Sequence, residues 1–454
     1  MPAFSTQAFA SALSECLPDA CNGKLCVAFS GGLDSTVLLR VLADLRPEHP
    51  AWQVRAVHVD HQLQQASVQW AEHCRKFAET LGVALLVERV VVARDDREGL
   101  EAAARKVRYA ALRHQLAEGE SLLTAHHCDD QAETLILALM RGSGVQGLAS
   151  MPARKRFGRG WHVRPLLSFA REELAMWASE NKFLGLDDPT NASRQHDRNY
   201  LRHEVLPTLK LRWPALSKSL LRSTQHLGEA LDVLNEVASA DLSACAVDSC
   251  LRIEELLNLS APRRRNLLRY WLRMQGFVLP STQKLSGLER DLSRANPERI
   301  PCVRWQGVEV RWYRGLLYAD IDREEFDRKN IAVWEHRSPF ELPARLGSLT
   351  LAPTQEIGLA VARLPERLTV RFRSGHERIR LPGRTHRHTL RNLLQESSVL
   401  PWWRDRLPLI YDDTRLLAVG DLALSAEHLA TPGEAAMRVV WDGAPKWRAV
   451  IRDS

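Results

Sequence analysis

The 454-residue sequence lacks paired metal-binding cysteines, long apolar runs and low-complexity tracts. None of its eight cysteines forms a Cys-x-x-Cys pair, so a structural zinc or iron–sulfur site has little support. No apolar run reaches the roughly 18 residues that suggest a membrane-spanning helix. No basic residue precedes the apolar part of the N-terminal segment, so a secretory signal is not expected. These absences predict a cytoplasmic protein with free thiols.

The overall composition is that of an ordinary globular protein, with 45% hydrophobic and 26% charged residues. Its length predicts about two to four domains. The formal net charge of +7 is only mildly basic. A charge of this size bears on function only where the basic residues cluster.

The first informative stretch is SGGLDS, at residues 30–35. An apolar run over 25–29 predicts a buried parallel strand, and helically spaced apolar residues follow from Val37. Gly31 and Gly32 permit unusual backbone angles and let a ligand approach the main chain. A strand, a glycine loop and a helix in this order direct backbone N–H groups at one point, which suits a phosphate.

The other residues of this loop refine the prediction. Ser30, Ser35 and Thr36 add hydroxyl donors. Asp34 would repel phosphate unless Mg²⁺ bridges the two groups. No lysine follows, so this is not the Gly-Lys-Ser/Thr phosphate loop. An ordinary strand–turn–helix connection is the alternative, and the complete SGGLDS string argues against it.

Apolar runs alternate with helical patterns over about 25–186. Strands are expected at 54–59, 84–92 and 121–124, and helices at 66–81, 99–118 and 130–140. This alternation predicts an α/β fold with a doubly wound parallel sheet. Ligands of such sheets bind beyond the carboxyl ends of the strands. SGGLDS, HVDH (58–61) and HHCDD (126–130) all follow strands, so we expect them at one edge.

The strand signal fades after about residue 213. We therefore expect an N-terminal catalytic domain over 1–214 and a mainly helical middle domain over 215–330. A linker region is expected over 331–365, followed by a small, basic α+β domain over 366–454.

Two groups of charged residues lie near the predicted edge. Asp130 and Glu133 are three residues apart at a helix start, so they share one face. Favourable interaction with the helix dipole is the simpler interpretation. With His126, His127 and Asp129 beside them, these acids could instead bind a metal, receive a cationic substrate or transfer protons.

Two arginine pairs also have helical spacing: Arg105 with Arg108, and Arg198 with Arg202. Guanidinium groups suit phosphate or carboxylate partners. The alternative in both cases is an ordinary charged surface helix.

Basic residues cluster in two glycine-broken segments, 154–164 and 371–391. The second contains seven arginines, three histidines and a single acid, and Trp402 and Trp403 follow soon after. A charge run is usually a solvated face, but this density favours a polyanion. Arginines and aromatic residues close to the predicted edge suit single-stranded RNA, whose bases can be stacked.

Together these stretches resemble the bacterial tRNA(Ile)-lysidine synthetase family, which is part of the PP-loop ATP pyrophosphatase superfamily. The resemblance covers most of the chain and rests on SGGLDS, HVDH and the segments 125–148, 187–207 and 388–411. The region 216–320 is less distinctive. One position departs from the family, because Gln64 stands where an arginine is common.

The resemblance implies a ligase that forms a C–N bond. ATP would adenylate the C2 oxygen of the wobble cytidine in an isoleucine tRNA with a CAU anticodon. Free lysine would then displace AMP to give lysidine, which changes the codon read from AUG to AUA. ATP and Mg²⁺ are the implied cofactors, and tRNA and lysine the implied partners. No membrane partner is implied, and a homodimer is left open.

The resemblance also implies roles for individual residues. ATP would contact the loop and the end of the second strand: Ser30, Gly31, Gly32, Leu33, Asp34, Ser35, Thr36 and His58. Asp34 would hold Mg²⁺ through the phosphates, and Asp130 and Glu133 would bind lysine. The implied catalytic residues are Asp34, Arg105, Arg108, His126, Asp130, Arg198 and Arg202. The implied tRNA-binding residues are Arg154, Lys155, Arg156, Arg371, Arg373, Arg384, Arg387 and Arg391.

Three other functions compete with this one. A PP-loop tRNA thiolase would usually need paired cysteines, which are missing, although Cys128 lies in HHCDD. A GMP- or NAD-type synthetase does not explain a basic C-terminal region. A non-catalytic RNA-binding protein does not explain the intact SGGLDS and the acidic cluster.

Overall fold

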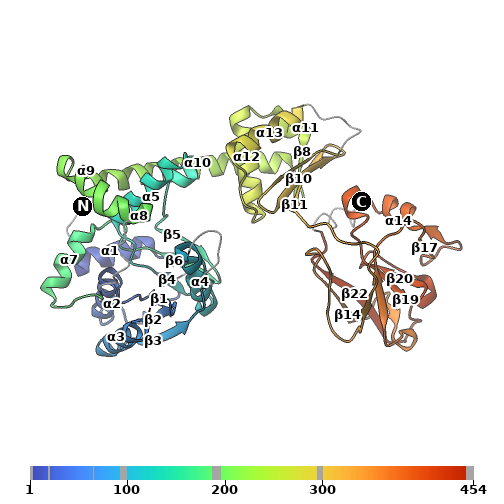
Figure 1. Cartoon of the computed structure of the whole chain (residues 1–454), viewed down its shortest axis with the longest axis horizontal. Helices are drawn as coiled ribbons and strands as arrows, with labels where there is room; N and C mark the ends of the chain where they lie inside the picture. Colours follow the sequence, from blue (N-terminus) through green and yellow to red (C-terminus); the bar gives the residue numbers. More distant parts are fainter. Residues whose placement is uncertain are drawn as a thin grey trace. The chain divides into compact units, whose positions relative to one another are not determined.

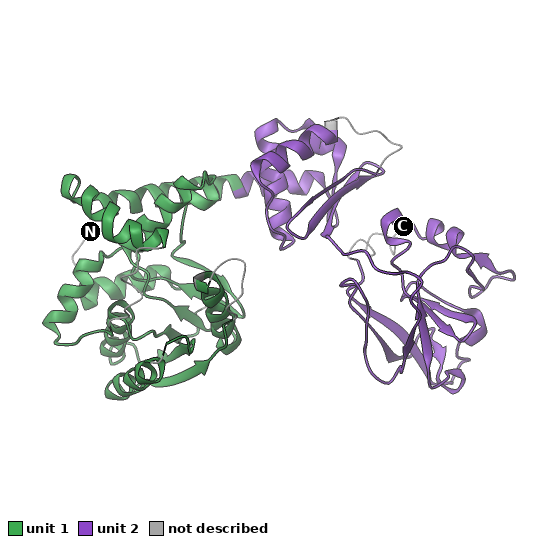
Figure 2. Ribbon diagram, in the orientation of Figure 1, with its two compact units in different colours: residues 1–234 green, residues 235–454 purple. Residues whose placement is uncertain are grey.

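The computed structural model describes residues 4–18, 21–64, 66–92, 100–186, 196–293 and 300–445. The chain divides into two compact units, Met1–Leu234 and Asn235–Ser454 (Figure 2). Among the described residues, every helix is too short or too polar to cross a lipid bilayer.

Unit 1 is built on a six-stranded sheet in the order β3-β2-β1-β4-β6-β5 (Figure 1). Its strands are β1 (Lys24–Ala28), β2 (Gln53–Asp60), β3 (Ala84–Arg89), β4 (Ser121–Leu123), β5 (Arg154–Phe157) and β6 (Gly160–Val163). Neighbouring strands are parallel except for the β5–β6 pair. The carboxyl ends of β1, β2 and β4 therefore meet at one edge, as predicted.

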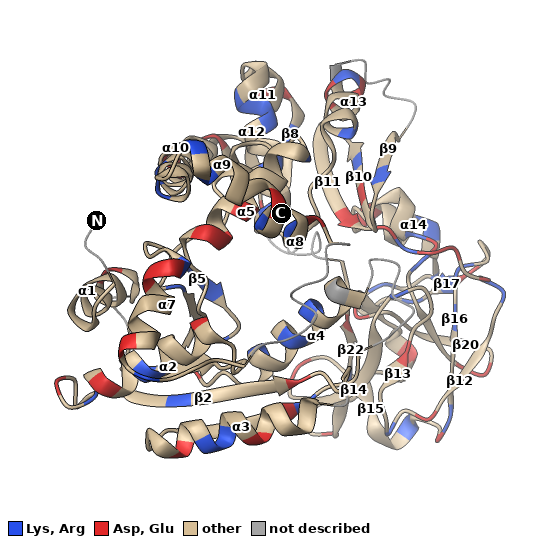
Figure 3. Cartoon of the chain, turned by 60° about the vertical axis from the view of Figure 1, so that its left-hand side comes forward, with Lys and Arg blue, Asp and Glu red and all other residues tan. Residues whose placement is uncertain are grey.

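Apolar helix faces cover both sides of this sheet, so it is doubly wound as predicted. One core contains side chains of α1 (Thr6–Cys16), α2 (Leu33–Leu45), α3 (Ser67–Thr80) and α7 (Arg171–Glu180). A second core contains Leu112 and Leu116 from α4 (Leu100–Gln115) and the segment after it. On α3, acidic and basic residues alternate along the exposed face, while Ala71, Cys74 and Ala78 are buried (Figure 3).

The helices that follow β4 carry much of the candidate site. They are α5 (Cys128–Met140), α6 (Val145–Leu148), α8 (Asp197–Tyr200), the π-helix η2 (Leu201–Val205), α9 (Leu206–Arg212) and α10 (Leu216–Cys245). The helix α5 begins at Cys128 because His127 caps it: the His127 ring accepts the Asp130 N–H, and the Asp130 carboxylate accepts the His127 N–H. The expected helix start at residue 130 was therefore two residues late.

The first part of unit 2 combines helices with a sheet, whereas the sequence suggested mainly helices. The helices are α11 (Ile253–Asn258), α12 (Ala261–Met274) and α13 (Thr282–Ser293). They pack on a five-stranded sheet ordered β7 (Ala246–Val247), β8 (Cys250–Arg252), β11 (Leu316–Ile321), β10 (Val308–Tyr313) and β9 (Cys302–Trp305). Residues 300–319 also show an apolar alternation that is typical of strands, and β9, β10 and most of β11 lie there, whereas β7 and β8 are too short to leave a sequence pattern.

The last part of unit 2 is rich in strands. One sheet is ordered β12 (Ala332–Trp334), β16 (Leu368–Arg371), β19 (Leu409–Asp412), β20 (Arg415–Val419) and β21 (Ala423–Leu424). Another is ordered β13 (Phe340–Glu341), β14 (Ser348–Thr354), β22 (Ala436–Asp442) and β15 (Leu359–Ala360). The remaining elements are the β17 (Arg378–Ile379) and β18 (His388–Thr389) pair and the helix α14 (Leu390–Glu396).

The expectation of a linker over 331–365 differs from the structure. The strand β14 pairs with β22 over seven residue pairs, and β12 pairs with β16. Trp334 is 1% exposed and belongs to the same core as Trp403. These residues are therefore part of the C-terminal fold. Their strands are short and border turns, so the apolar alternation that would have revealed them is weak.

Candidate active site

The glycine loop after β1 is held in one conformation by residues behind it. Gly31 has a φ of +85°, and a Cβ there would lie 2.7 Å from Leu186 Cδ1 and 2.8 Å from Cys74 Sγ. The Leu186 N–H also donates to the Gly31 carbonyl at 2.8 Å. Both the backbone angle and the close contacts therefore require glycine.

Hydroxyl groups brace this loop from within. The buried Thr36 Oγ1 donates to the Gly31 and Gly32 carbonyls at 3.2 and 3.0 Å. The Ser30 and Ser35 hydroxyls lie 3.0 Å apart. No side chain caps the start of α2 at Gly32, so no capping side chain accepts a hydrogen bond from the N–H groups of its first turn. The predicted contact of Thr36 with ATP stays a prediction, since its hydroxyl is used by the main chain.

A pocket of about 200 Å³, here called the loop pocket, opens at the carboxyl ends of β1, β2 and β4. Its lining includes residues from the glycine loop, from β2, from α4 and from the segment after β4: Ala28, Phe29, Ser30, Gly32, Asp34, Ser35, Val57, Val59, Arg108, Tyr109, Leu112, Thr124, Ala125 and His126. Apolar strand residues and polar loop groups thus share one cavity. Such a cavity can take an apolar ring at one end and an anionic group at the other.

His58, predicted to contact ATP, is 6% exposed and is absent from the described lining of the loop pocket. Its Nδ1 lies 2.9 Å from the Phe29 carbonyl and 3.5 Å from Cys74 Sγ. Burial lowers the pKa of His58, so the ring is neutral. His58 supports the strand that leads into the glycine loop, and its contact with ATP stays a prediction.

Asp34 is the charged residue of the glycine loop, and it is incompletely paired. Its Oδ1 is buried and has no hydrogen-bond partner among the described residues. The basic side chains beside it are Arg171, whose Nε lies 3.8 Å from Oδ1, and His127, whose Nε2 lies 3.7 Å from Oδ2. Burial raises the pKa of Asp34 against the lowering effect of these two groups. An unpartnered carboxylate oxygen beside a phosphate-type loop fits a bound Mg²⁺.

Asp130 and Glu133 are both paired with arginines in this structure. Glu133, 1% exposed, accepts from Arg198 Nε at 2.7 Å and from Arg202 Nε at 2.6 Å. Asp130 Oδ1 lies 3.0 Å from Nη2 of each arginine. Burial alone would raise the pKa of Asp130, but His127 and Arg198 hold it below its usual value. The predicted acids and arginines therefore neutralise one another here.

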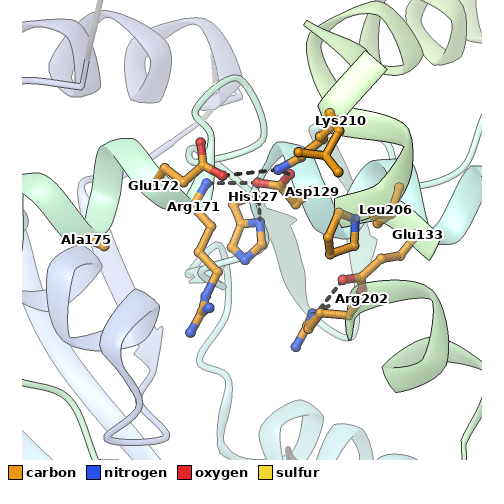
Figure 4. Close-up of a pocket in the computed structure, with 11 residues that line it drawn as sticks. His127, Asp129, Glu133, Arg171, Glu172, Ala175, Arg202, Leu206 and Lys210 are labelled. Atoms are coloured by element: carbon orange, nitrogen blue, oxygen red, sulfur yellow. Dashed lines mark hydrogen bonds and ion pairs between the residues drawn. The ribbon is translucent and has the colours of Figure 1, made fainter. Parts of the chain in front are cut away.

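A second cavity of about 450 Å³, here called the charged pocket, lies beside this cluster (Figure 4). Figure 4 shows Lys210 between Asp129 and Glu172, with Arg202 and Glu133 on the other side. The Lys210 Nζ lies 2.8 Å from Asp129 Oδ1 and 3.4 Å from Glu172 Oε1. The charged pocket is thus lined by acids and bases that already have partners.

Asp129 is the most heavily bonded acid of this pocket. It accepts from the Arg171 N–H at 2.9 Å and from Ser217 Oγ at 2.7 Å, besides its contact with Lys210. Burial alone would raise its pKa, but these hydrogen bonds lower it to about 2. Sequence analysis placed Asp129 in the acidic group beside the histidines without a separate role, and it assigned none to Arg171 or Lys210. HHCDD marked Asp129, but no sequence pattern linked it to the other two.

The other predicted catalytic arginines lie on α4. Arg108 lines the loop pocket, and its guanidinium lies 5.6 Å from the Tyr109 ring centroid. Arg105 lies 5.1 Å from the same ring. Residues 187–195 of the predicted stretch 187–207 lie outside the described residues. Arg108 is therefore brought to the loop pocket and Arg105 only to the neighbouring Tyr109 ring, whereas Arg198 and Arg202 are brought to the acids.

The predicted tRNA-binding residues lie on two separate surfaces. Arg154, Lys155 and Arg156 are exposed on β5, and Arg156 stacks 4.1 Å from the Trp161 ring centroid. In unit 2, three of the predicted arginines form ion pairs: Arg373 with Asp405 at 3.4 Å, Arg384 with Glu396 at 3.0 Å and Arg387 with Glu427 at 3.0 Å. The Arg371 guanidinium lies 4.6 Å from the Tyr411 ring centroid, and Arg391 is exposed. Acids thus partly neutralise the C-terminal basic segment.

Family models match three parts of the chain. A PP-loop domain matches residues 5–209, a TilS substrate binding domain matches 251–318, and a TilS substrate C-terminal domain matches 368–441. Among solved structures, the U34-tRNA thiolase NcsA from Methanococcus maripaludis is similar with a TM-score of 0.41 at 17% identity. That similarity covers 49% of this chain and 78% of the thiolase.

Curated relatives match nearly the whole chain. A tRNA(Ile)-lysidine synthase of Coxiella burnetii is 39% identical over 398 residues, which are 88% of each chain. A tRNA(Ile)-lysidine synthase of Xanthomonas campestris pv. campestris (strain 8004) is 42% identical over 419 residues, 92% of this chain and 95% of the relative. With identity at this level along nearly the whole length, and with the PP-loop motif at the described edge, the chain belongs to the tRNA(Ile)-lysidine synthase family.

Proposed function

We propose that this protein ligates lysine to C2 of the wobble cytidine in the CAU-anticodon isoleucine tRNA, with conversion of ATP to AMP and pyrophosphate. Family membership supports the reaction class. The observation that carries the proposal is the loop pocket, in which SGGLDS meets His126 and Arg108 at the carboxyl edge of the sheet. We further propose that the reaction takes place in the cytoplasm.

The chemistry proceeds in two balanced steps. The C2 oxygen of cytidine attacks the α-phosphorus of ATP and pyrophosphate leaves. The lysine ε-amine, once deprotonated, then attacks C2, the C–O bond breaks and AMP departs. Because the ordinary pKa of that amine is about 10.4, a nearby base must accept its proton.

In the first step, the residues of the glycine loop hold the phosphates. The positive φ of Gly31 and the uncapped start of α2 leave main-chain N–H groups for an anion. Asp34, with its unpartnered Oδ1, fits Mg²⁺, which would neutralise phosphate charge. Among the described residues no cluster of three metal-ligating side chains occurs, which agrees with an ion held mainly by substrate phosphates.

In the second step, Asp130 and Glu133 bind the amino groups of lysine. Their pairing with Arg198 and Arg202 sets a condition on this proposal. The carboxylates can receive an ammonium group only when at least part of this pairing breaks. Arginines released from the acids are then available to the phosphate of the adenylate, which agrees with their proposed catalytic role.

The tRNA contacts Arg154, Lys155 and Arg156 on β5 and the basic segment of unit 2. The lysine and arginine side chains on β5 are exposed, and Arg156 and Trp161 form a stack of the kind on which an unpaired base can extend. Burial and nearby arginines lower the pKa of Lys155, so an incoming phosphate would relieve the repulsion it experiences. A homodimer stays a prediction, which sedimentation of the full chain would test.

The thiolase alternative is not favoured. The relatives that cover most of the chain are lysidine synthases. Burial also raises the pKa of Cys128 to about 12, and a thiol in that state is a poor nucleophile. A non-catalytic RNA-binding role leaves Asp34 and its unpartnered oxygen without a purpose.

The deciding experiment mixes the purified protein with ATP, Mg²⁺, radiolabelled lysine and individual tRNAs. We expect label only in the CAU-anticodon isoleucine tRNA, together with one AMP for each lysine incorporated. The CAU-anticodon methionine tRNA is the matched control. Formation of ADP in place of AMP, or equal labelling of the methionine tRNA, would contradict the proposal.

A further inference from the structure

Four polar side chains, here called the relay, lead from the interior of unit 1 to the loop pocket. They are Arg164, His162, Thr124 and His126. Arg164 Nη2 lies 3.1 Å from His162 Nδ1, and His162 Nε2 lies 2.9 Å from Thr124 Oγ1. Thr124 Oγ1 in turn lies 2.7 Å from Nδ1 of His126, which lines the pocket. The parallel pairing of β4 with β6 brings these residues together, because Leu122 and Leu123 align with His162 and Val163.

The donor and acceptor of the first two contacts follow from the chemistry of arginine. Arginine can only donate, so His162 Nδ1 must accept. Burial lowers the pKa of His162 to about 2, which keeps its ring neutral with the hydrogen on Nε2. That hydrogen is donated to the Thr124 oxygen. The Thr124 hydroxyl keeps its own hydrogen for a second contact, and we assign that hydrogen to His126 Nδ1, 2.7 Å away.

His126 completes the sequence. Burial lowers its pKa to about 3, so its ring is also neutral. With Nδ1 accepting from Thr124, its hydrogen lies on Nε2. Arg164 remains protonated, since burial lowers its pKa only to about 10. Its guanidinium is held in place by the Pro152 carbonyl, which accepts from Nη1 at 2.7 Å.

We propose that Arg164, His162 and Thr124 are positioning residues that hold His126 as the neutral Nε2–H tautomer, an uncharged donor for an oxygen of the bound nucleotide or its adenylate. This inference rests on the proposed function and assigns a chemical state to one of its catalytic residues. The opposite tautomer would present a lone pair, which repels phosphate oxygens. The buried Arg164 therefore selects what the loop pocket can bind without adding its own charge to that pocket.

The first test reads the tautomer directly. The full chain is labelled with ¹⁵N-histidine, and the His126 signals are identified by their loss in His126→Gln. We expect nitrogen shifts of an unprotonated Nδ1 and a protonated Nε2 at neutral pH. A protonated Nδ1, or a doubly protonated ring, in the unsubstituted protein would overturn the proposal, and this result requires no variant of the relay to fold.

The second test removes only the relay hydroxyl. Thr124→Val keeps the side-chain shape, and Thr124→Ser keeps the hydroxyl. We expect Thr124→Val to change the His126 nitrogen shifts and to lower kcat for AMP formation about tenfold. That is less than the roughly 100-fold loss expected when a charge-stabilising donor is removed outright. Thr124→Ser should restore both properties, with KM for lysine unchanged in either variant.

The outcomes separate the relay from the proposed function. Thr124→Val with altered nitrogen shifts and normal kcat would overturn the role of the relay. Equal losses in Thr124→Val and Thr124→Ser would show that the hydroxyl does not matter, and would also overturn it. Failure of the unsubstituted protein to label any tRNA, while His126 shows the expected shifts, would contradict the proposed function and leave the tautomer assignment standing.

Discussion

The loop pocket and the charged pocket are adjacent, but they differ in how far their acidic side chains are paired with basic ones. In the loop pocket, Asp34 keeps an unpartnered oxygen and His126 is a neutral ring. In the charged pocket, every acid discussed above is paired with an arginine or lysine. His127 joins the two, because its Nε2 lies 3.7 Å from Asp34 and 3.4 Å from Asp130.

The difference shows how one active site can handle two substrates of opposite charge. An anionic nucleotide can enter the loop pocket without breaking an existing ion pair. At the proposed amine site, a cationic amino acid would have to compete with Arg198 and Arg202 for Asp130 and Glu133. This arrangement favours nucleotide binding first and amine binding second, which is the order that the two-step reaction requires.

The comparison is tested most strongly by Asp34→Asn, which removes the incompletely paired carboxylate of the loop pocket. We expect pyrophosphate release to fall at least about 100-fold, while tRNA binding is retained. Asp44→Asn on the same helix is the matched control, because Asp44 only pairs with the exposed Arg40. Pyrophosphate release assays on both variants decide the matter. Equal rates in the two variants would remove the metal role from Asp34.

The rigidity of the loop pocket is tested by Gly31→Ala. We expect a loss of about 2–4 kcal/mol in the free energy of unfolding. About 1 kcal/mol comes from the positive φ and the rest from overpacking against Leu186 and Cys74. Gly142→Ala is the control, since Gly142 also has a positive φ but has open space around it.

Urea unfolding of both glycine variants separates these two contributions. Gly142→Ala should lose only about 1 kcal/mol. If Gly31→Ala were no less stable than Gly142→Ala, the contacts behind the glycine loop would not constrain it.

The charged pocket is tested by Glu133→Gln. Glu133 is buried and accepts from both arginines, so we expect a loss of about 1.5–3 kcal/mol in unfolding free energy. KM for lysine should rise more than KM for ATP. Glu172→Gln is the control, because the Glu172 side chain is 78% exposed and should lose less than about 0.5 kcal/mol. An unchanged KM for lysine in Glu133→Gln would reject the amine-site proposal.

The smallest effect concerns acid stability. Hydrogen bonds lower the pKa of Asp129 from 3.8 to about 2, so its contribution is fully present above pH 3.8 and is lost as the pH falls through about 2. A shift of this size corresponds to about 2 kcal/mol. The stability difference between the unsubstituted protein and Asp129→Asn should therefore shrink over that window. A difference that grows on acidification would contradict the assigned pKa direction.

Local sequence patterns predicted the strands β1, β2, β3 and β4 of the N-terminal sheet, which contain apolar runs, and the periodic helix α2. They did not predict β5 and β6, because β5 is Arg-Lys-Arg-Phe and this segment was expected only as a basic cluster. They failed over 331–365, where β12 and β15 are three and two residues long and pair with the distant strands β16 and β22. In strands this short, the β-propensity of two or three residues is too weak a signal to predict the strand.

The sequence predicted the residues of the candidate site that lie in compact motifs, but it did not predict their partners from distant segments. Asp34, His126, Asp130 and Glu133 stand in compact motifs, so their types and spacing could be read directly. The partners of Asp129 could not, because Arg171 and Ser217 are 42 and 88 residues away along the chain. An acid followed by another acid in the sequence does not reveal whether a base from another helix neutralises it.

The amino-acid sequence alone determined the glycine loop, the alternation of strands and helices, and the residue types at the sheet edge. Each of these follows from local backbone freedom or from apolar periodicity. Only the tertiary structure decided which charges are paired, that Thr36 faces the main chain, and that Thr124 lies within hydrogen-bond distance of His126 Nδ1. Those properties depend on burial and on distances between strands and helices far apart in the chain, and the energy of a charge or a hydrogen bond changes with both.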